Sequence, residues 1–165
     1  MTCRSLAMLL ILFLASALPA RADDPAAVAR AFYDSYTKAS NAERFDRVAF
    51  TRSQEARLEP DLYATLLNIM AKGPEDGVWL DFDPYANAQM NVATLSLGPA
   101  TVKDGLASVW MSASYRSPGP ERPAVKLVLR PGGPEGWRIA NFLYPGDDGL
   151  PSWDLRSWLK KQLEK

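Results

Sequence analysis

The segment from Trp79 to Gln89 carries the densest set of chemically active side chains in this chain. It reads Trp-Leu-Asp-Phe-Asp-Pro-Tyr-Ala-Asn-Ala-Gln, with two carboxylates, three aromatic rings and two side-chain amides. Carboxylates act as general bases or metal ligands, and amides and phenols orient ligands through hydrogen bonds. The segment is therefore the first candidate for a site.

Asp81 and Asp83 are the candidate catalytic residues. Two positions apart on a strand, their side chains point to the same side and repel each other unless one is protonated or paired. One interpretation is a carboxylate pair in a pocket, with either residue as a base. The other, which we favour, is structural: Asp83 caps the turn that Pro84 starts, and Asp81 pairs with an arginine.

Neutral side chains supply the candidate ligand contacts. Tyr85, Asn87 and Gln89 must be hydrogen-bonded wherever they are buried, and such groups most often tie a loop to a sheet. In the alternative, Gln89 and Asn141 line a ligand cavity. On that alternative, the ligand-binding residues are Trp79, Asp81, Tyr85, Gln89 and Asn141.

Aromatic side chains elsewhere admit the same two interpretations. We favour a core over an apolar cavity, because a domain of this size buries most of its rings. The rings concerned are Trp79, Trp110, Trp137, Phe32 and Tyr36. Trp137 is thus grouped with Asp83 and Pro84 as structural.

The composition excludes several kinds of chemistry. The chain has no histidine, which removes the commonest base, the commonest metal ligand and any serine–histidine triad. The one cysteine is Cys3, near the N-terminus. Two carboxylates without histidine would suit only Ca²⁺ or Mg²⁺, and no calcium-loop spacing is present. We therefore predict neither a metal site nor a cofactor.

Residues 1–22 are typical of a signal peptide. Arg4 precedes an apolar run from Leu6 to Leu18, and Ala20-Arg21-Ala22 is a small-x-small cleavage site. We predict cleavage after Ala22, a periplasmic or secreted protein, one domain over residues 23–165, and no membrane span after cleavage; an uncleaved anchor is the alternative. Removing Arg4 and Arg21 leaves 19 − 2 = 17 basic against 19 acidic residues, so no nucleic-acid footprint is expected.

Helical patterns dominate the first half of the domain. Apolar residues every three or four positions predict helices near 25–38 and 60–72, started by Asp24-Pro25 and Glu59-Pro60 and with Gly73 as the second helix's cap. Thr51 is a candidate cap for a short helix over 53–58. We interpret Arg44, Arg47, Arg52 and Arg57 as a solvated basic face.

Strand patterns dominate the second half. Residues 77–82 alternate and could form a strand, and strands are predicted at 91–103 with a kink at Gly98-Pro99, and at 106–116, 124–130 and 137–144. Ser152 is expected to cap a last helix near 153–164. Trp153 and Trp158 could not both face inward on that helix, so an exposed tryptophan that marks a partner surface is one alternative.

The order of elements, helices first and then antiparallel strands, predicts an α+β fold, with a cone-like curved antiparallel sheet and helices packed on its concave face. Three features resemble a bacterial family of exported domains of unknown function, which is similar to the cone superfamily of nuclear transport factor 2 and ketosteroid isomerase. They are Phe32-Tyr33-xx-Tyr36, Asp81-Phe82-Asp83-Pro84-Tyr85-xxx-Gln89, and Gly136-Trp137-Arg138-Ile139-Ala140-Asn141. The resemblance implies the cone fold over about 25–163 and an uncharacterised function. No catalytic role of the isomerase can be matched to a residue here.

Two function classes stay open on the sequence. The first is a non-catalytic binding or interaction module for a small apolar ligand or a protein partner, with a homodimer not excluded. The second is a cofactor-free isomerase or dehydratase that uses Asp81 or Asp83 as its base. A carboxylate with a raised pKa inside an enclosed apolar cavity, with a tyrosine in hydrogen-bond reach, would favour the second.

Overall fold

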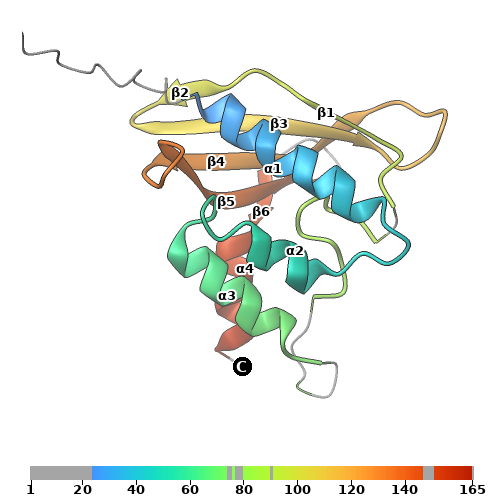
Figure 1. The fold of residues 1–165 in the computed structure, drawn as a ribbon, viewed down its shortest axis with the longest axis horizontal. Coiled ribbons are helices and arrows are strands. Elements are labelled where there is room, and N and C mark those ends of the chain that lie inside the picture. Colours follow the sequence, from blue (N-terminus) through green and yellow to red (C-terminus); the bar gives the residue numbers. More distant parts are fainter. Residues whose placement is uncertain (1–23, 74–75, 77–79, 90, 147–150, 165) are drawn as a thin grey trace, which may run out of the picture.

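The computed structural model describes residues 24–73, 76, 80–89, 91–146 and 151–164. In these residues the chain forms an α+β fold, with four helices on one side of a six-stranded antiparallel open sheet (Figure 1). The predicted fold class is confirmed. The predicted signal peptide and Trp79 lie outside the described residues.

The first helix follows directly from its sequence. α1 (Pro25–Ser40) begins after Asp24, whose Oδ1 accepts a hydrogen bond of 2.9 Å from Ala26 N, and Pro25 occupies the first turn. Val28, Phe32 and Tyr36 recur every four residues and are buried. That stripe packs α1 across β3 and β5.

The second helix differs from the prediction. α2 (Arg47–Ser53) starts at Asp46, whose Oδ1 accepts from Ala49 N at 3.0 Å, so the cap is Asp46 and Thr51 lies inside the helix. The predicted helix over 53–58 is wrong because Leu58 instead pairs with Ile139 as an isolated parallel bridge. Residues 54–57 form hydrogen-bonded turns, and Leu58 then reaches the sheet at Ile139.

The third helix begins where expected and ends early. α3 (Pro60–Met70) starts after Glu59, and Ala71 caps it in the right-handed conformation rather than Gly73. The predicted strand at 77–82 is wrong for residues 80–82, which have no strand pairing, and residues 77–79 lie outside the described part. Leu80 is nevertheless buried, at 4% exposure, so this segment packs by its side chains.

The sheet is antiparallel throughout, as predicted. Its strands are β1 (Thr94–Leu97), β2 (Thr101–Lys103), β3 (Leu106–Ser114), β4 (Arg122–Pro131), β5 (Trp137–Pro145) and β6 (Pro151–Asp154), in the order β1-β3-β4-β5-β6 with β2 also on β3. The Gly98-Pro99 interruption, predicted as a kink within one strand, instead divides the segment into two strands, β1 and β2. Asp104 and Gly105 take φ of 51° and 74° in the β2–β3 turn, the left-handed backbone that a tight hairpin needs.

The last strand is a correction to the predicted C-terminal helix. β6 pairs with β5 through Leu143↔Asp154 and Tyr144↔Trp153, and only then does α4 (Leu155–Leu163) begin. Its cap is Asp154, whose Oδ1 accepts from Ser157 N at 2.9 Å, and not Ser152. Trp153 therefore lies on a strand, so the argument about two tryptophans on one helix does not apply.

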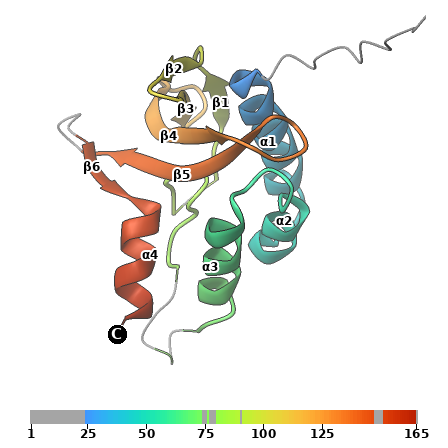
Figure 2. The same ribbon diagram turned by 90° about the vertical axis from the view of Figure 1, so that its left-hand side faces the viewer.

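Curvature gives the molecule a concave side. Register shifts interrupt the pairing at Met111/Ser112, Val128/Leu129 and Tyr144/Pro145, and such bulges bend a sheet. Figure 2 shows β5 and β6 curving down into α4, with α1 and α2 on the side away from α4. None of the helices in the described ranges has the length and hydrophobicity that crossing a bilayer requires.

Candidate functional site

The segment Asp83–Ala88 fills the concave side of the sheet. Figure 2 shows the chain before β1 passing between α4 on one side and α2 and α3 on the other. The segment folds back on itself, with Asp83 N donating to Ala88 O at 2.7 Å, and Pro84, Tyr85 and Ala86 are buried. We call residues 83–88 the plug.

Four tyrosine hydroxyl groups hold the plug in place. Tyr33 and Tyr36 of α1 donate to Tyr85 O at 2.8 Å and to Asp83 Oδ2 at 2.9 Å. Tyr144 of β5 donates to Pro84 O at 2.8 Å. Tyr115, directly after β3, donates to Ala86 O at 2.8 Å. The carbonyl groups of Pro84, Tyr85 and Ala86 are therefore satisfied by side chains, as buried backbone groups need partners.

Asp83 has the capping role that the sequence predicts. Its Oδ1 accepts from Tyr85 N at 2.9 Å while Oδ2 accepts from Tyr36. Burial raises the pKa of Asp83 above its ordinary value, outweighing the two hydrogen bonds and the nearby charge of Arg47, which lower it. Arg47 also donates from Nη1 to Phe82 O at 2.6 Å, so α2 is tied to the start of the plug.

Tyr85 is a core residue and not a ligand contact. It is fully buried, its hydroxyl shares a hydrogen bond of 2.5 Å with Thr51 Oγ1, and its ring packs against Phe32, Phe50 and Phe142 at centroid distances of 5.4, 5.1 and 5.6 Å. Rings at these separations and steep angles pack edge to face. The interior between the curved sheet and its helices is thus occupied by aromatic side chains.

The other predicted ligand contacts do not converge. Asp81 is exposed and pairs with no arginine among the described residues, contrary to the prediction, and Gln89 is exposed as well. Asn141 holds the β5–β6–α4 corner: its Nδ2 donates to Asp154 Oδ1 at 2.8 Å and its Oδ1 accepts from Arg156 N at 3.1 Å. Although partial burial opposes it, these bonds and that from Ser157 lower the pKa of Asp154.

The tryptophans are mostly structural. Trp137 is buried at the start of β5, as predicted, whereas Trp110 is 39% exposed on the open face of the sheet. Trp153 and Trp158 are both half-buried and both pack on Phe82, at 5.5 and 5.9 Å. Neither Trp153 nor Trp158 is therefore the exposed tryptophan of the alternative interpretation.

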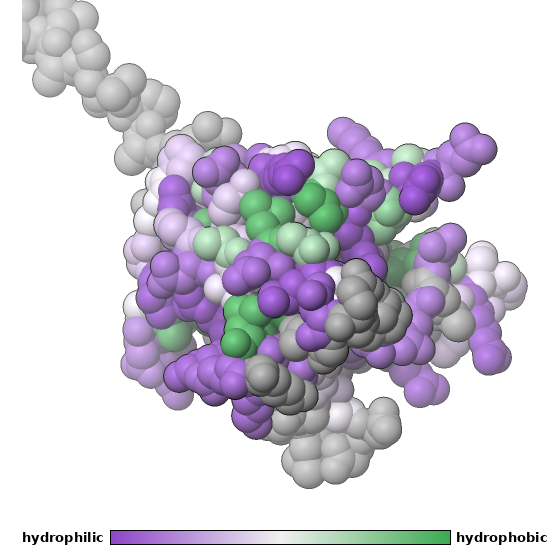
Figure 3. All heavy atoms as spheres, turned by 90° about the horizontal axis from the view of Figure 1, so that it is seen from below, coloured by the Kyte–Doolittle hydropathy of each residue, from purple (hydrophilic) through white to green (hydrophobic). Residues whose placement is uncertain are grey.

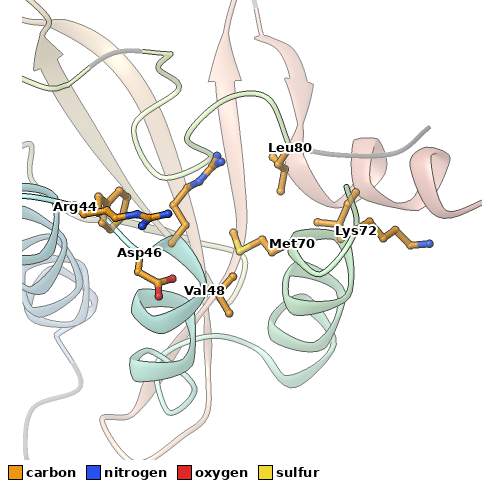
Figure 4. A pocket seen from close by; sticks show the side chains of 9 residues that line it. Arg44, Asp46, Val48, Met70, Lys72 and Leu80 are labelled. Carbon is orange, nitrogen blue, oxygen red and sulfur yellow. The ribbon is translucent and has the colours of Figure 1, made fainter. Parts of the chain in front are cut away.

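An open cleft lies beside the plug, between α2 and α3. Its volume is about 590 Å³. Figure 4 shows Val48 and Met70 facing each other across it, with Leu80 above. The apolar lining residues are Phe45, Val48, Ile69, Met70 and Leu80. We call this hollow the α2–α3 cleft.

Positive charge predominates in the α2–α3 cleft. Three cationic side chains, Arg44, Arg47 and Lys72, line it against one carboxylate, Asp46, whose Oδ1 is engaged as the cap of α2. In Figure 4 the Arg44 side chain extends into the hollow, while Lys72 points outward at the opposite rim. The prediction that Arg47 belongs to a solvated face is therefore wrong, as it is for Arg57, which forms an ion pair with Glu135.

The molecular surface beyond the cleft is mixed. On the face in Figure 3, hydrophobic side chains appear as small separate patches between hydrophilic ones. Among the described residues, no group of three or more histidine, cysteine, aspartate or glutamate side chains is arranged to hold a metal ion.

Comparisons with protein-family models, curated proteins and solved structures give no significant match. The resemblance to the nuclear transport factor 2 superfamily therefore stays a prediction. What the site does has to be inferred from its own geometry.

Proposed function

We propose that this protein is an exported binding domain that takes a small ligand with an apolar body and an anionic group into the α2–α3 cleft. The observation that carries the proposal is the composition of that hollow, with apolar side chains from three segments and a rim dominated by cations. Small-molecule sites are typically mostly apolar concavities with a few polar groups that fix orientation.

The residues of the cleft have distinct roles in this proposal. Val48, Met70 and Leu80 give the apolar body a surface to cover, and Arg44 meets the anionic group. Guanidinium suits a carboxylate or phosphate because its donors form a planar fork. Arg47 is partly committed to Phe82 O, so it contributes charge and holds the wall in place.

The catalytic alternative is less well supported. Asp83 does have a raised pKa and a tyrosine hydroxyl at 2.9 Å, two features of a base site. Yet both of its oxygens already accept hydrogen bonds, one from Tyr85 N within the plug and one from the Tyr36 hydroxyl of α1, and Asp83 does not line the α2–α3 cleft. Asp81 is exposed. A binding role therefore explains the geometry with fewer assumptions than proton abstraction does.

Calorimetric titration with sodium decanoate tests the proposal, with decyltrimethylammonium as the probe of opposite charge. We expect saturable binding of decanoate, and weaker or no binding of the cation. Arg44→Gln should weaken decanoate binding about twofold to fivefold, the effect of one exposed ion pair. Val48→Asp should weaken it further, because it places a carboxylate in the apolar wall.

Lys161→Gln is the matched control, because it removes one exposed cation from α4, outside the cleft. Equal decanoate affinity in Arg44→Gln, Val48→Asp and wild type, or preference for the cationic probe, would contradict the proposal. If decanoate binds as expected, mass spectrometry of small molecules released from protein purified from its native host would identify the natural ligand.

A further inference from the structure

Arg138 is a guanidinium group for which the described part of the chain provides no counter-ion. Its Nε is buried without a hydrogen-bond partner. Directly opposite it across the β4–β5 pair stands Arg130. Arginine stays charged at any physiological pH, and like charges opposite each other on a sheet repel. An unsatisfied buried donor of this kind is rare and calls for an explanation.

Arg57, Arg130 and Arg156 have acidic partners, and Arg138 forms no ion pair within the described part of the chain. Glu135, in the β4–β5 turn, gives both carboxylate oxygens to Arg57, at 3.1 and 2.9 Å. Glu59 bonds Arg130 at 3.2 Å and Arg156 at 3.0 Å. Glu135 and Glu59 are thus already paired with other arginines.

Arg138 lines an open pocket of about 590 Å³ between the β4–β5 turn and the connection from α2 to α3. Arg52, in the last turn of α2, lines the same hollow, with Tyr63 of α3 and a single acidic residue, the exposed Glu55. None of its residues belongs to the α2–α3 cleft. We call it the Arg138 pocket.

The backbone of the turn holds the guanidinium in position. Gly133 has a φ of 80° and lies so close that a Cβ there would stand 2.5 Å from Arg138 Nε. The glycine therefore allows the turn to pack over Nε, and this close contact restricts the positions open to the side chain. A preformed donor loses less entropy on binding than a mobile one.

We propose that the Arg138 pocket is a second binding site, specific for an oxyanion, with Arg138 and Arg52 as its cationic ligands. Carboxylate, phosphate and sulfate groups each present two oxygen atoms on one central atom. A guanidinium can donate a pair of parallel hydrogen bonds to such oxygens. Tyr63 lines the same hollow, and its hydroxyl is the further donor that the proposal assigns to the site. The bound anion would supply the charge that Arg138 lacks beside Arg130.

NMR titration of ¹⁵N-labelled protein with sodium phosphate tests this, with sodium chloride adjusted to keep ionic strength constant. We expect saturable shifts centred on the amides of Arg138, Gly133, Arg52 and Tyr63. Parallel titrations with sodium acetate and sodium sulfate distinguish the three oxyanions. Saturable binding by none of them, or shifts spread evenly over the surface, would overturn the proposal.

Variants separate this site from a general charge effect. Arg138→Gln should abolish the saturable shifts and Arg52→Gln should weaken them at least threefold, while Lys161→Gln should leave them unchanged. Without added anion, Arg138→Gln should melt no lower than wild type, because the change removes a repulsion with Arg130. Phosphate affinity that survives in both Arg138→Gln and Arg52→Gln would refute the assignment, whatever decanoate does at the other site.

Discussion

Replacing Asp83 tests how the plug is held. Asp83→Ala removes the acceptors of Tyr85 N and of the Tyr36 hydroxyl, each at 2.9 Å. A lost capping group costs about 0.5–2 kcal/mol, and each buried donor left unpaired adds about 1–3 kcal/mol. Removing a desolvated carboxylate offsets part of this, which leaves a net loss of about 2–4 kcal/mol in the free energy of unfolding at neutral pH. For a domain of this size that corresponds to a fall in melting temperature of about 6–12 °C.

Asp83→Asn is the matched comparison because it retains an acceptor oxygen for Tyr85 N. We expect it to lose much less stability than Asp83→Ala. The pH dependence gives a second readout. Because the pKa of Asp83 is raised in the folded state above its ordinary 3.8, folding takes up a proton between those two values. The stability of wild type relative to Asp83→Asn should therefore fall as pH rises from about 3.8 through the folded-state pKa.

Thermal denaturation of Asp83→Ala, Asp83→Asn and Asp81→Ala, each from about pH 3.5 to 7.5, is the assay. Asp81 is exposed, so Asp81→Ala should melt like wild type or slightly higher. If Asp83→Ala melts like wild type while Asp81→Ala collapses, the roles of the two carboxylates have been assigned the wrong way round.

Three further predictions follow from the same structure. Tyr36→Phe keeps the ring but removes the bond to Asp83 Oδ2, and should cost about 1–3 kcal/mol at neutral pH and less near pH 4; an equal loss at both pH values in chemical denaturation would count against it. Asp154→Ala should lower the free energy of unfolding by about 0.5–2 kcal/mol. Because the pKa of Asp154 lies below its ordinary 3.8, the stability difference from wild type should shrink as pH falls below that value. A stability difference that stays constant in acid denaturation would refute the role given to the Asp154 carboxylate. Intact-mass analysis after expression in an exporting bacterial host should show a chain beginning at Asp23, and a mass that retains residues 1–22 would exclude the predicted cleavage.

The sequence predicts the elements whose signals are local. Asp24-Pro25 and the four-residue spacing of Phe32 and Tyr36 are enough to define α1. Asp104-Gly105 specifies a hairpin because both residues tolerate positive φ. The Asp83 cap was predictable as well, since a carboxylate just before a proline turn reaches the next backbone amide.

Features that depend on distant partners were not predictable. β6 is only four residues long, and its pairing with β5 outweighs the helical pattern that runs through Trp153. The plug depends on hydroxyl groups at positions 33, 36, 115 and 144, none of which has a sequence signal for its acceptor. Sequence alone therefore could not decide between the two interpretations of Tyr85, a loop tie or a ligand contact.

The α2–α3 cleft was missed for the same reason. Its lining comes from residues 44–48, 69–72 and 80, and only the packing of α2 against α3 brings these segments together. The one available signal was the series of arginines before and within α2. Arg44 and Arg52 are exposed as predicted, but Arg47 does not belong to that solvated face, because it contacts Phe82 O, 35 positions away in sequence.

The central claim, that the α2–α3 cleft is a binding site, is tested most directly by an NMR footprint of decanoate on ¹⁵N-labelled protein. We expect saturable chemical-shift changes concentrated on the amides of residues 44–48, 69–72 and 80. These changes should be reduced in Val48→Asp and unchanged in Lys161→Gln. Saturable shifts centred on any other part of the molecule, or none at all, would contradict it.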